Sequence, residues 1–305
     1  MDAIKIGNGE ITASEISLGC MRMAGLSVKQ ASGVIGTALE EGINFFDHAD
    51  IYGGGKSEEI FSQAIGMTPR VREKIILQSK CGIGNKCYDF SKKHILEAVD
   101  GSLKRLKTDY LDILLLHRPD ALAEPEEVAE AFDELHRAGK VRYFGVSNHN
   151  PMQIELLGKY LNQKILVNQL QFGVMHTGMI DSGINVNMHT DRSIDRDGSI
   201  LDYCRLKNIT VQAWSPFQYG FFEGVFLDNG KFPELNRKIN EIAAARGIPN
   251  TAVAIAWILR HPAKIQPIVG TMNCGRLKDI CKASGVKLTR REWYDIYLAA
   301  GNPLP

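Results

Sequence analysis

The sequence has no long apolar stretch, and its first residues carry no export signal. No run of residues approaches the roughly 18 apolar positions of a membrane-spanning helix. The first 20 residues lack the basic segment followed by an apolar segment that is typical of a secretory signal. We therefore expect no membrane partner and predict a cytoplasmic protein.

The sequence also lacks an excess of charge and a recognisable cysteine pattern. The 36 Lys and Arg residues offset 35 Asp and Glu, which gives no basic surface for nucleic acid. The six cysteines form no CxxC pair and no zinc-type spacing with histidine, and a chain of 305 residues does not need disulfides to fold. No Pro- or Gly-rich linker divides the chain, so we interpret residues 1–305 as one domain. Its oligomeric state cannot be inferred.

What the chain does contain is a regular alternation of strand and helix patterns. Residues 4–12 predict a short β-hairpin about a Gly-Asn-Gly turn. Eight apolar strand-like runs follow, separated by helical periodicity, at residues 15–20, 43–47, 73–80, 111–117, 141–147, 165–171, 210–214 and 264–269. Such alternation is typical of an open doubly wound sheet or a closed barrel, and the count of eight favours a (β/α)8 TIM barrel with an N-terminal hairpin lid.

Four polar residues stand at the ends of these runs or just after them. Asp47, Lys80 and His117 each close a run, and Tyr52 follows Asp47 in the next loop. Parallel barrels build their active sites at the carboxyl ends of the strands, so we expect the four side chains to converge there. Any one of them alone is more often a hydrogen-bonded residue of the rim than a catalyst. Four in successive βα units indicate a site.

The chemistry of these four residue types points to carbonyl groups. A lysine ammonium close to a tyrosine favours the phenolate, so Lys80 is expected to lower the pKa of Tyr52 and make it a usable proton donor and acceptor. Asp47 would hold Lys80 charged and oriented, and a neutral His117 could donate a hydrogen bond to a bound carbonyl oxygen.

With these residues the chain resembles a known family, the aldo-keto reductases, which are NAD(P)H-dependent oxidoreductases on a (β/α)8 barrel. The resemblance runs from about residue 11 to residue 288 and rests on the segments DHADIYGGGKSE, QSK, DILLLHRPD, FGVSNH, VNQLQ, WSPF and VGTMNCGRLKD. The details HADIYGG, LQSKCGI and LLLHRPD are similar to a bacterial subgroup whose members are mostly assigned only as predicted oxidoreductases.

The resemblance implies roles for individual residues. Tyr52 would be the proton donor in carbonyl reduction, with Lys80 and Asp47 as its partners and His117 as the donor that orients the substrate. The cofactor would be NADPH, with NADH possible because Gly270 stands where many members have a lysine, and the substrate would be a small aldehyde or ketone. The expected cofactor contacts are Gly19, Cys20, Met21, Arg22, Asp47, Ser147, Asn148, Gln169, Trp214, Ser215, Pro216, Phe217, Gly220, Gly270, Thr271, Asn273, Arg276 and Asp279.

The resemblance also implies which part of the cofactor several of these residues contact. Ser147, Asn148 and Gln169 match positions that hold the nicotinamide carboxamide, and Trp214 stands where most members have a tyrosine that stacks on the nicotinamide. Arg276 matches the arginine that grips the 2′-phosphate of NADP. The two long connections at residues 173–199 and 215–232 are expected to lie over the site and shape its specificity.

Two other functions are consistent with parts of the sequence. A nucleotide-binding regulatory barrel with little turnover, as some potassium-channel-associated relatives exemplify, would keep the fold and the cofactor. A metal-dependent hydrolase could use His48 and His117, but no third ligand joins them, so we expect no metal site. The glycines of YGGGKSE have neither Walker nor GxGxxG spacing.

Overall fold

Eight parallel strands close into a barrel in the computed structural model, which describes residues 1–305. Each strand pairs with the next along the chain, and β12 pairs with β3 to complete the ring. The predicted (β/α)8 barrel is thereby confirmed. Its strands are β3 (Ser17–Gly19), β4 (Phe45–Asp47), β5 (Ile76–Cys81), β6 (Leu111–Leu116), β7 (Val141–Ser147), β8 (Ile165–Gln171), β9 (Thr210–Trp214) and β12 (Gln266–Val269).

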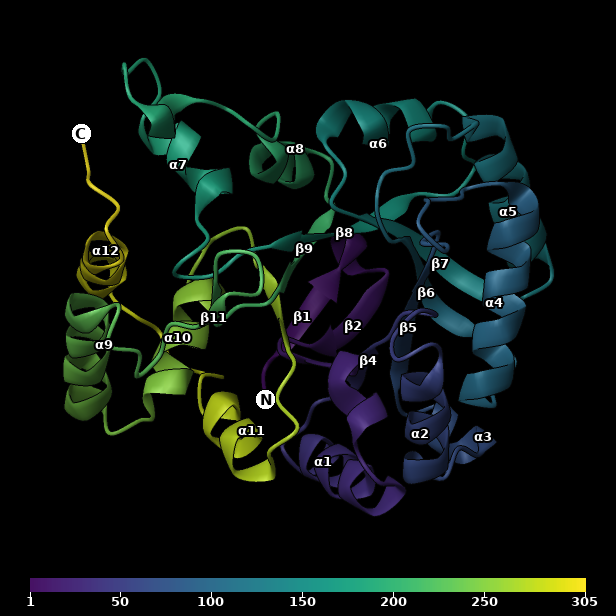
Figure 1. Ribbon diagram of the computed structural model, residues 1–305, viewed down its shortest axis with the longest axis horizontal. Helices are drawn as coiled ribbons and strands as arrows, with labels where there is room; N and C mark the ends of the chain where they lie inside the picture. The colour runs from purple at the N-terminus through teal and green to yellow at the C-terminus, as the bar shows by residue number, and fades with distance from the viewer.

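Helices surround the ring of strands (Figure 1). Several begin where the sequence supplies a cap: Ser27 and Asn150 each accept a hydrogen bond from the backbone N–H three residues on, within a complete capping box. The helices are α1 (Val28–Glu40), α2 (Lys56–Ile65), α3 (Pro69–Arg72), α4 (Lys92–Leu106), α5 (Pro125–Arg137), α6 (Pro151–Gly158), α7 (Gly178–Ile184), α8 (Ile200–Leu206), α9 (Pro233–Arg246), α10 (Asn250–Leu259), α11 (Cys274–Cys281) and α12 (Arg290–Ala299).

The predicted N-terminal hairpin is also present, as β1 (Ala3–Ile6) and β2 (Ile11–Ser14). The φ angles of Asn8 (62°) and Gly9 (103°) are positive, as a tight turn requires. The backbone N–H of Gly7 donates to the Thr210 hydroxyl (3.0 Å), at the residue where β9 begins. The hairpin therefore closes the barrel at the amino ends of its strands, in the middle of the ring in Figure 1. It is a floor on the side away from the site.

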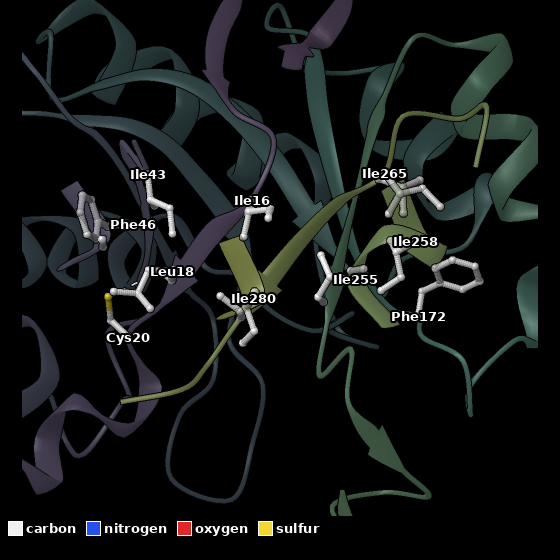
Figure 2. Packing of buried hydrophobic residues seen from close by; sticks show 14 of the residues in the cluster. Ile16, Leu18, Cys20, Ile43, Phe46, Phe172, Ile255, Ile258, Ile265 and Ile280 are labelled. Atoms are coloured by element: carbon white, nitrogen blue, oxygen red, sulfur yellow. Dashed lines mark hydrogen bonds between the residues drawn. The ribbon is translucent and has the colours of Figure 1, made fainter. Parts of the chain in front are cut away.

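Two apolar clusters hold the fold together. The larger lies between the barrel and its helices, and Figure 2 shows part of it, including Leu18, Cys20 and Phe46. The smaller contains Ile4 and Ile6 of the hairpin with Phe45, Ile113 and other inward-facing residues of the barrel. Because side chains alternate along a strand, the residue two positions after Phe45 also faces inward, and that residue is Asp47. The packing of Phe45 against the N-terminal hairpin thus directs the Asp47 side chain into the barrel.

The long connections contain structure that the sequence did not predict. Helix α7 lies within residues 173–199, and the strands β10 (Gln218–Tyr219) and β11 (Gly224–Val225) form a small hairpin within residues 215–232. No single helix is long and apolar enough to span a membrane, although α9 and α10, joined at a bend of 94°, reach the required length and composition together. The interpretation of residues 1–305 as one domain stays a prediction.

Candidate active site

The four polar residues meet at the carboxyl ends of β4, β5 and β6. The Lys80 ammonium donates to both carboxylate oxygens of Asp47 (2.7 and 2.8 Å) and to the carbonyl of His48 (2.7 Å). The same nitrogen lies 3.2 Å from the Tyr52 hydroxyl. The rings of Tyr52 and His117 stand edge to face, with centroids 6.0 Å apart. The predicted convergence is therefore present.

Burial and the neighbouring side chains together set the protonation of this cluster. It works to lower the pKa of Lys80, but Asp47 and Tyr52 outweigh it and raise that pKa above its usual value, so the ammonium stays charged. For Tyr52, burial raises the pKa above 10.0, and the opposing effect of Lys80 is smaller. The sequence-based expectation that Lys80 lowers the pKa of Tyr52 overall is thus not met. The phenol is held protonated.

His117 is held neutral. Burial lowers its pKa to about 2, and the positive charges of Lys80 and Arg118 act in the same direction. Its Nδ1 atom is buried and has no hydrogen-bond partner. Because His117 lines the cavity described next, a neutral imidazole that donates from Nε2 is the form it can present to a ligand.

A cavity of about 870 Å³ opens above these groups. Its floor is formed by Asp47, Tyr52 and His117, while Lys80 lies beneath them and is only 1 % exposed. From the floor the cavity extends past Trp214 to Arg276 on α11. A second cavity of about 880 Å³ adjoins it, because Arg118, Asn148, Trp214 and Phe221 line both.

Comparison with known proteins agrees with this geometry. A family model described as the Aldo/keto reductase family matches residues 15–297, which include the whole barrel. The chain belongs to the aldo/keto reductase family. It is an NAD(P)H-dependent oxidoreductase that acts on carbonyl groups, as the resemblance had implied.

The relatives of this aldo/keto reductase include named bacterial enzymes. It is 39 % identical over 274 residues to the uncharacterized oxidoreductase YcsN of Bacillus subtilis (strain 168), covering 86 % of this chain and 85 % of YcsN. It is 36 % identical over 277 residues to a 6-dehydroglucose reductase of Agrobacterium fabrum, covering 87 % and 86 %. Among solved structures, the thermostable aldo-keto reductase Tm1743, in complex with the inhibitor epalrestat, superposes with a TM-score of 0.79 at 25 % identity, covering 98 % of this chain and all of that one.

The residues expected at the nicotinamide lie together in this reductase. Ser147, Asn148, Gln169 and Trp214 all line the cavity. Asn148 accepts from the Trp214 indole N–H (3.1 Å) and donates to the Ser147 hydroxyl (2.7 Å), which fixes the three side chains relative to one another. Gln169 donates to Asp47 (3.0 Å), so the expected cofactor contacts touch the proton-donor cluster directly.

Most of the other expected cofactor contacts also line the cavity, and they are Gly19, Met21, Arg22, Ser215, Pro216, Phe217, Gly270, Thr271 and Arg276. Four do not. Cys20 is fully buried in the outer core (Figure 2), because side chains alternate and Gly19 is the residue that faces the cavity. Asn273 caps α11 by accepting from the Arg276 N–H, and Asp279 pairs with Lys282 (2.9 Å).

Gly220 is the fourth residue that does not line the cavity. It has a positive φ of 57°, and its carbonyl accepts from Gln171 (3.2 Å). Its place is therefore in the turn of the loop that carries the neighbouring cavity residues Phe221 and Phe222.

Other cavity residues were missed by sequence reasoning. Arg118 and Gln218 line the cavity, and three further glutamines, Gln78, Gln212 and Gln266, lie buried below its floor. The strand patterns place these glutamines on the inward face, but only closure of the barrel brings them together. Among the phenylalanines in or next to the two loops, Phe221 and Phe222 reach the cavity, whereas Phe172 and Phe226 are in the core.

The histidine considered as a metal ligand lies elsewhere. The ring of His48 is fully buried outside the barrel against Phe61, at a centroid distance of 4.6 Å. Burial lowers its pKa to about 3. No three His, Cys, Asp or Glu side chains anywhere in the chain are arranged to hold a metal ion.

Proposed function

We propose that this aldo/keto reductase uses NADPH to reduce aldehydes or ketones to alcohols, with Tyr52 as the proton donor. When bound, the cofactor supplies a hydride for the carbonyl carbon, and the proton for the carbonyl oxygen comes from the Tyr52 hydroxyl. The observation that carries the proposal is the 3.2 Å contact between Lys80 Nζ and Tyr52 at the floor of a cavity that His117 also lines.

The residues of the cavity fit a nicotinamide dinucleotide. Trp214 offers an aromatic face to the nicotinamide ring. The Gln169 side chain makes both of its hydrogen bonds through Nε2, which leaves Oε1 free to accept from a carboxamide N–H. At the far end, the guanidinium of Arg276 forms no ion pair within the protein, and Thr271 lines the same cavity. A planar guanidinium with no carboxylate partner suits a phosphate group.

The site residues then divide the proton chemistry among themselves. Because burial holds the pKa of Tyr52 above its usual value, the phenol carries its proton throughout the physiological pH range. As the proton passes to the carbonyl oxygen, the ammonium of Lys80 stabilises the phenolate that remains. His117 donates from Nε2 to the same oxygen and fixes its position.

Substitution of Tyr52 by phenylalanine tests this proposal. Tyr52→Phe should retain NADPH affinity, measured by fluorescence titration, and lose at least about 100-fold in turnover with an aldehyde panel, the usual contribution of a general acid. Tyr88→Phe is a matched control, since Tyr88 is exposed and does not line the cavity. Unchanged turnover in Tyr52→Phe would refute the role. A wild-type protein that binds NADPH but scarcely oxidises it would instead fit the regulatory barrel.

We further propose that the carbonyl substrates are polar and hydroxylated. Most of the residues that line the second cavity are polar, among them Asn150, Gln153, Gln171 and His176, and the cavity adjoins the catalytic one. These polar side chains can exchange hydrogen bonds with the hydroxyls of a substrate. The name of the Agrobacterium relative, a 6-dehydroglucose reductase, points to the same class of substrate. A cytoplasmic location stays a prediction.

A further inference from the structure

A layer of glutamine side chains fills the barrel directly beneath the proton-donor cluster. Gln78, Gln169, Gln212 and Gln266 come from four different strands, and none is more than 3 % exposed. Branched apolar residues usually fill the interior of such barrels, as they do here one layer lower, around Phe45. Four buried amides at this level require an explanation, because burying a polar group costs folding free energy unless the group is hydrogen-bonded.

The amides form one chain whose direction is fixed at its lower end. Gln266 donates to the backbone carbonyl of Ser14 in the hairpin (2.7 Å), and a carbonyl can only accept. The oxygen of Gln266 therefore faces the amide nitrogen of Gln212, which donates to it (2.9 Å). The oxygen of Gln212 in turn accepts from Gln78 (2.8 Å) and Gln169 (3.1 Å). Exchanging the oxygen and nitrogen positions of any one of these amides would place two acceptors or two donors against each other.

The upper end of the chain is the carboxylate of Asp47. Its Oδ1 accepts from Gln78 (2.6 Å) and Gln169 (3.0 Å) as well as from Lys80 (2.7 Å). The nitrogen of Gln78 serves both Asp47 and Gln212, while its own buried oxygen has no partner. Gln78 is thus held in an orientation that leaves one of its polar atoms unsatisfied, and the group that benefits is the carboxylate.

We infer that Gln78 and Gln212 are positioning residues for the reaction. The inference rests on the proposed function. The N–H donors replace the water that Asp47 loses on burial and fix its carboxylate plane, so that both oxygens meet Lys80 and Lys80 in turn stays within reach of Tyr52. Gln212 touches neither Asp47 nor Lys80. It acts by determining which end of each neighbouring amide faces the carboxylate.

The experiment replaces the amides with methionine, which keeps volume and removes polarity. In Gln78→Met and Gln212→Met we expect the single-turnover rate of NADPH oxidation to fall at least tenfold, with NADPH affinity and substrate KM changed less than about twofold. This split is the signature of an interaction that serves the chemical step rather than binding. Ile113→Val, a change in the apolar cluster around Phe45, controls for loosening of the barrel and should keep the wild-type rate.

A second variant keeps the inference testable if a methionine variant does not fold. The carboxyl of Gln212→Glu can replace the amide only while protonated, when it donates to Gln266 and accepts from Gln78. The single-turnover rate of this variant should therefore fall as pH rises, in a range where the wild-type rate is flat. Gln169 and Gln78 link this position to Asp47 and Lys80, and both charged groups are the same in the variant and the wild type.

The outcomes distinguish failure of the positioning role from failure of the proposed function. Methionine variants with the wild-type rate, or with rate, KM and NADPH affinity all impaired together, would overturn the positioning role, as would a Gln212→Glu variant whose pH profile matches the wild type. If instead the Tyr52→Phe variant turns over normally, the proposed function itself fails. Circular dichroism and thermal unfolding establish that each variant is folded before its rate is compared.

Discussion

Arg276 gives the sharpest test of cofactor choice, because its guanidinium can be removed without disturbing the fold. The side chain is exposed on α11 and forms no ion pair. The first turn of the helix is secured independently, since the backbone N–H of Arg276 donates to the Asn273 side chain (2.9 Å). Arg276→Gln should therefore leave the thermal unfolding of the free protein nearly unchanged.

The expected loss can be estimated from the contact it would make with a 2′-phosphate. A charge-assisted hydrogen bond contributes about 1.5–3 kcal/mol, and solvent screening at an exposed site favours the lower end. About 1.5 kcal/mol corresponds to roughly a tenfold weaker NADPH Kd. NADH lacks the 2′-phosphate, so its Kd should stay within about twofold.

Parallel fluorescence titrations with NADPH and NADH measure both values. Lys278→Gln is the matched control, because it removes one positive charge from the same helix at a side chain that is 51 % exposed and 4.0 Å from Glu40. It should affect neither Kd. Equal weakening of NADPH and NADH in Arg276→Gln, or no weakening at all, would show that this guanidinium does not recognise the phosphate.

Two further predictions concern pH and substrate. Burial raises the pKa of Tyr52 above 10.0, and the reduction needs the protonated phenol. The single-turnover rate should therefore be constant from about pH 6 to 9 and fall only at higher pH. A decline centred near pH 7 in a stopped-flow series would contradict this. The polar second cavity predicts that glyceraldehyde has a higher kcat/KM than butanal by at least about tenfold; steady-state assays that show the reverse order would argue against hydroxylated substrates.

The sequence predicted the barrel and its reactive residues well, because both depend on local patterns. Eight apolar runs separated by helical periodicity leave few topologies, and a polar residue at the end of a buried strand has one place to go. The sequence alone therefore predicts that Asp47, Lys80 and His117 share one rim. Tyr52 follows Asp47 so closely along the chain that the same rim contains it.

Other features depend on distances that a sequence does not contain. Cys20 stands at the end of the first strand-like run and is therefore expected near the cofactor, but β3 ends at Gly19 and the Cys20 side chain turns outward into the core. The sign of the Tyr52 pKa shift depended on burial, which outweighs the effect of Lys80. The glutamine chain could not be predicted for a third reason. A single glutamine in an apolar strand does not indicate a hydrogen-bonded chain, because its partners lie on other strands that are distant in the sequence.

The bond between Gln266 and the carbonyl of Ser14 spans 252 residues of sequence. During synthesis at roughly 5–20 residues per second, the amino-terminal segment would wait on the order of 10–50 s before its partner leaves the ribosome. Until then β3 has an unpaired edge and the hairpin has no closed ring to seal. Nascent chains of this enzyme therefore expose that edge, which could pair with another chain, until the final strand emerges.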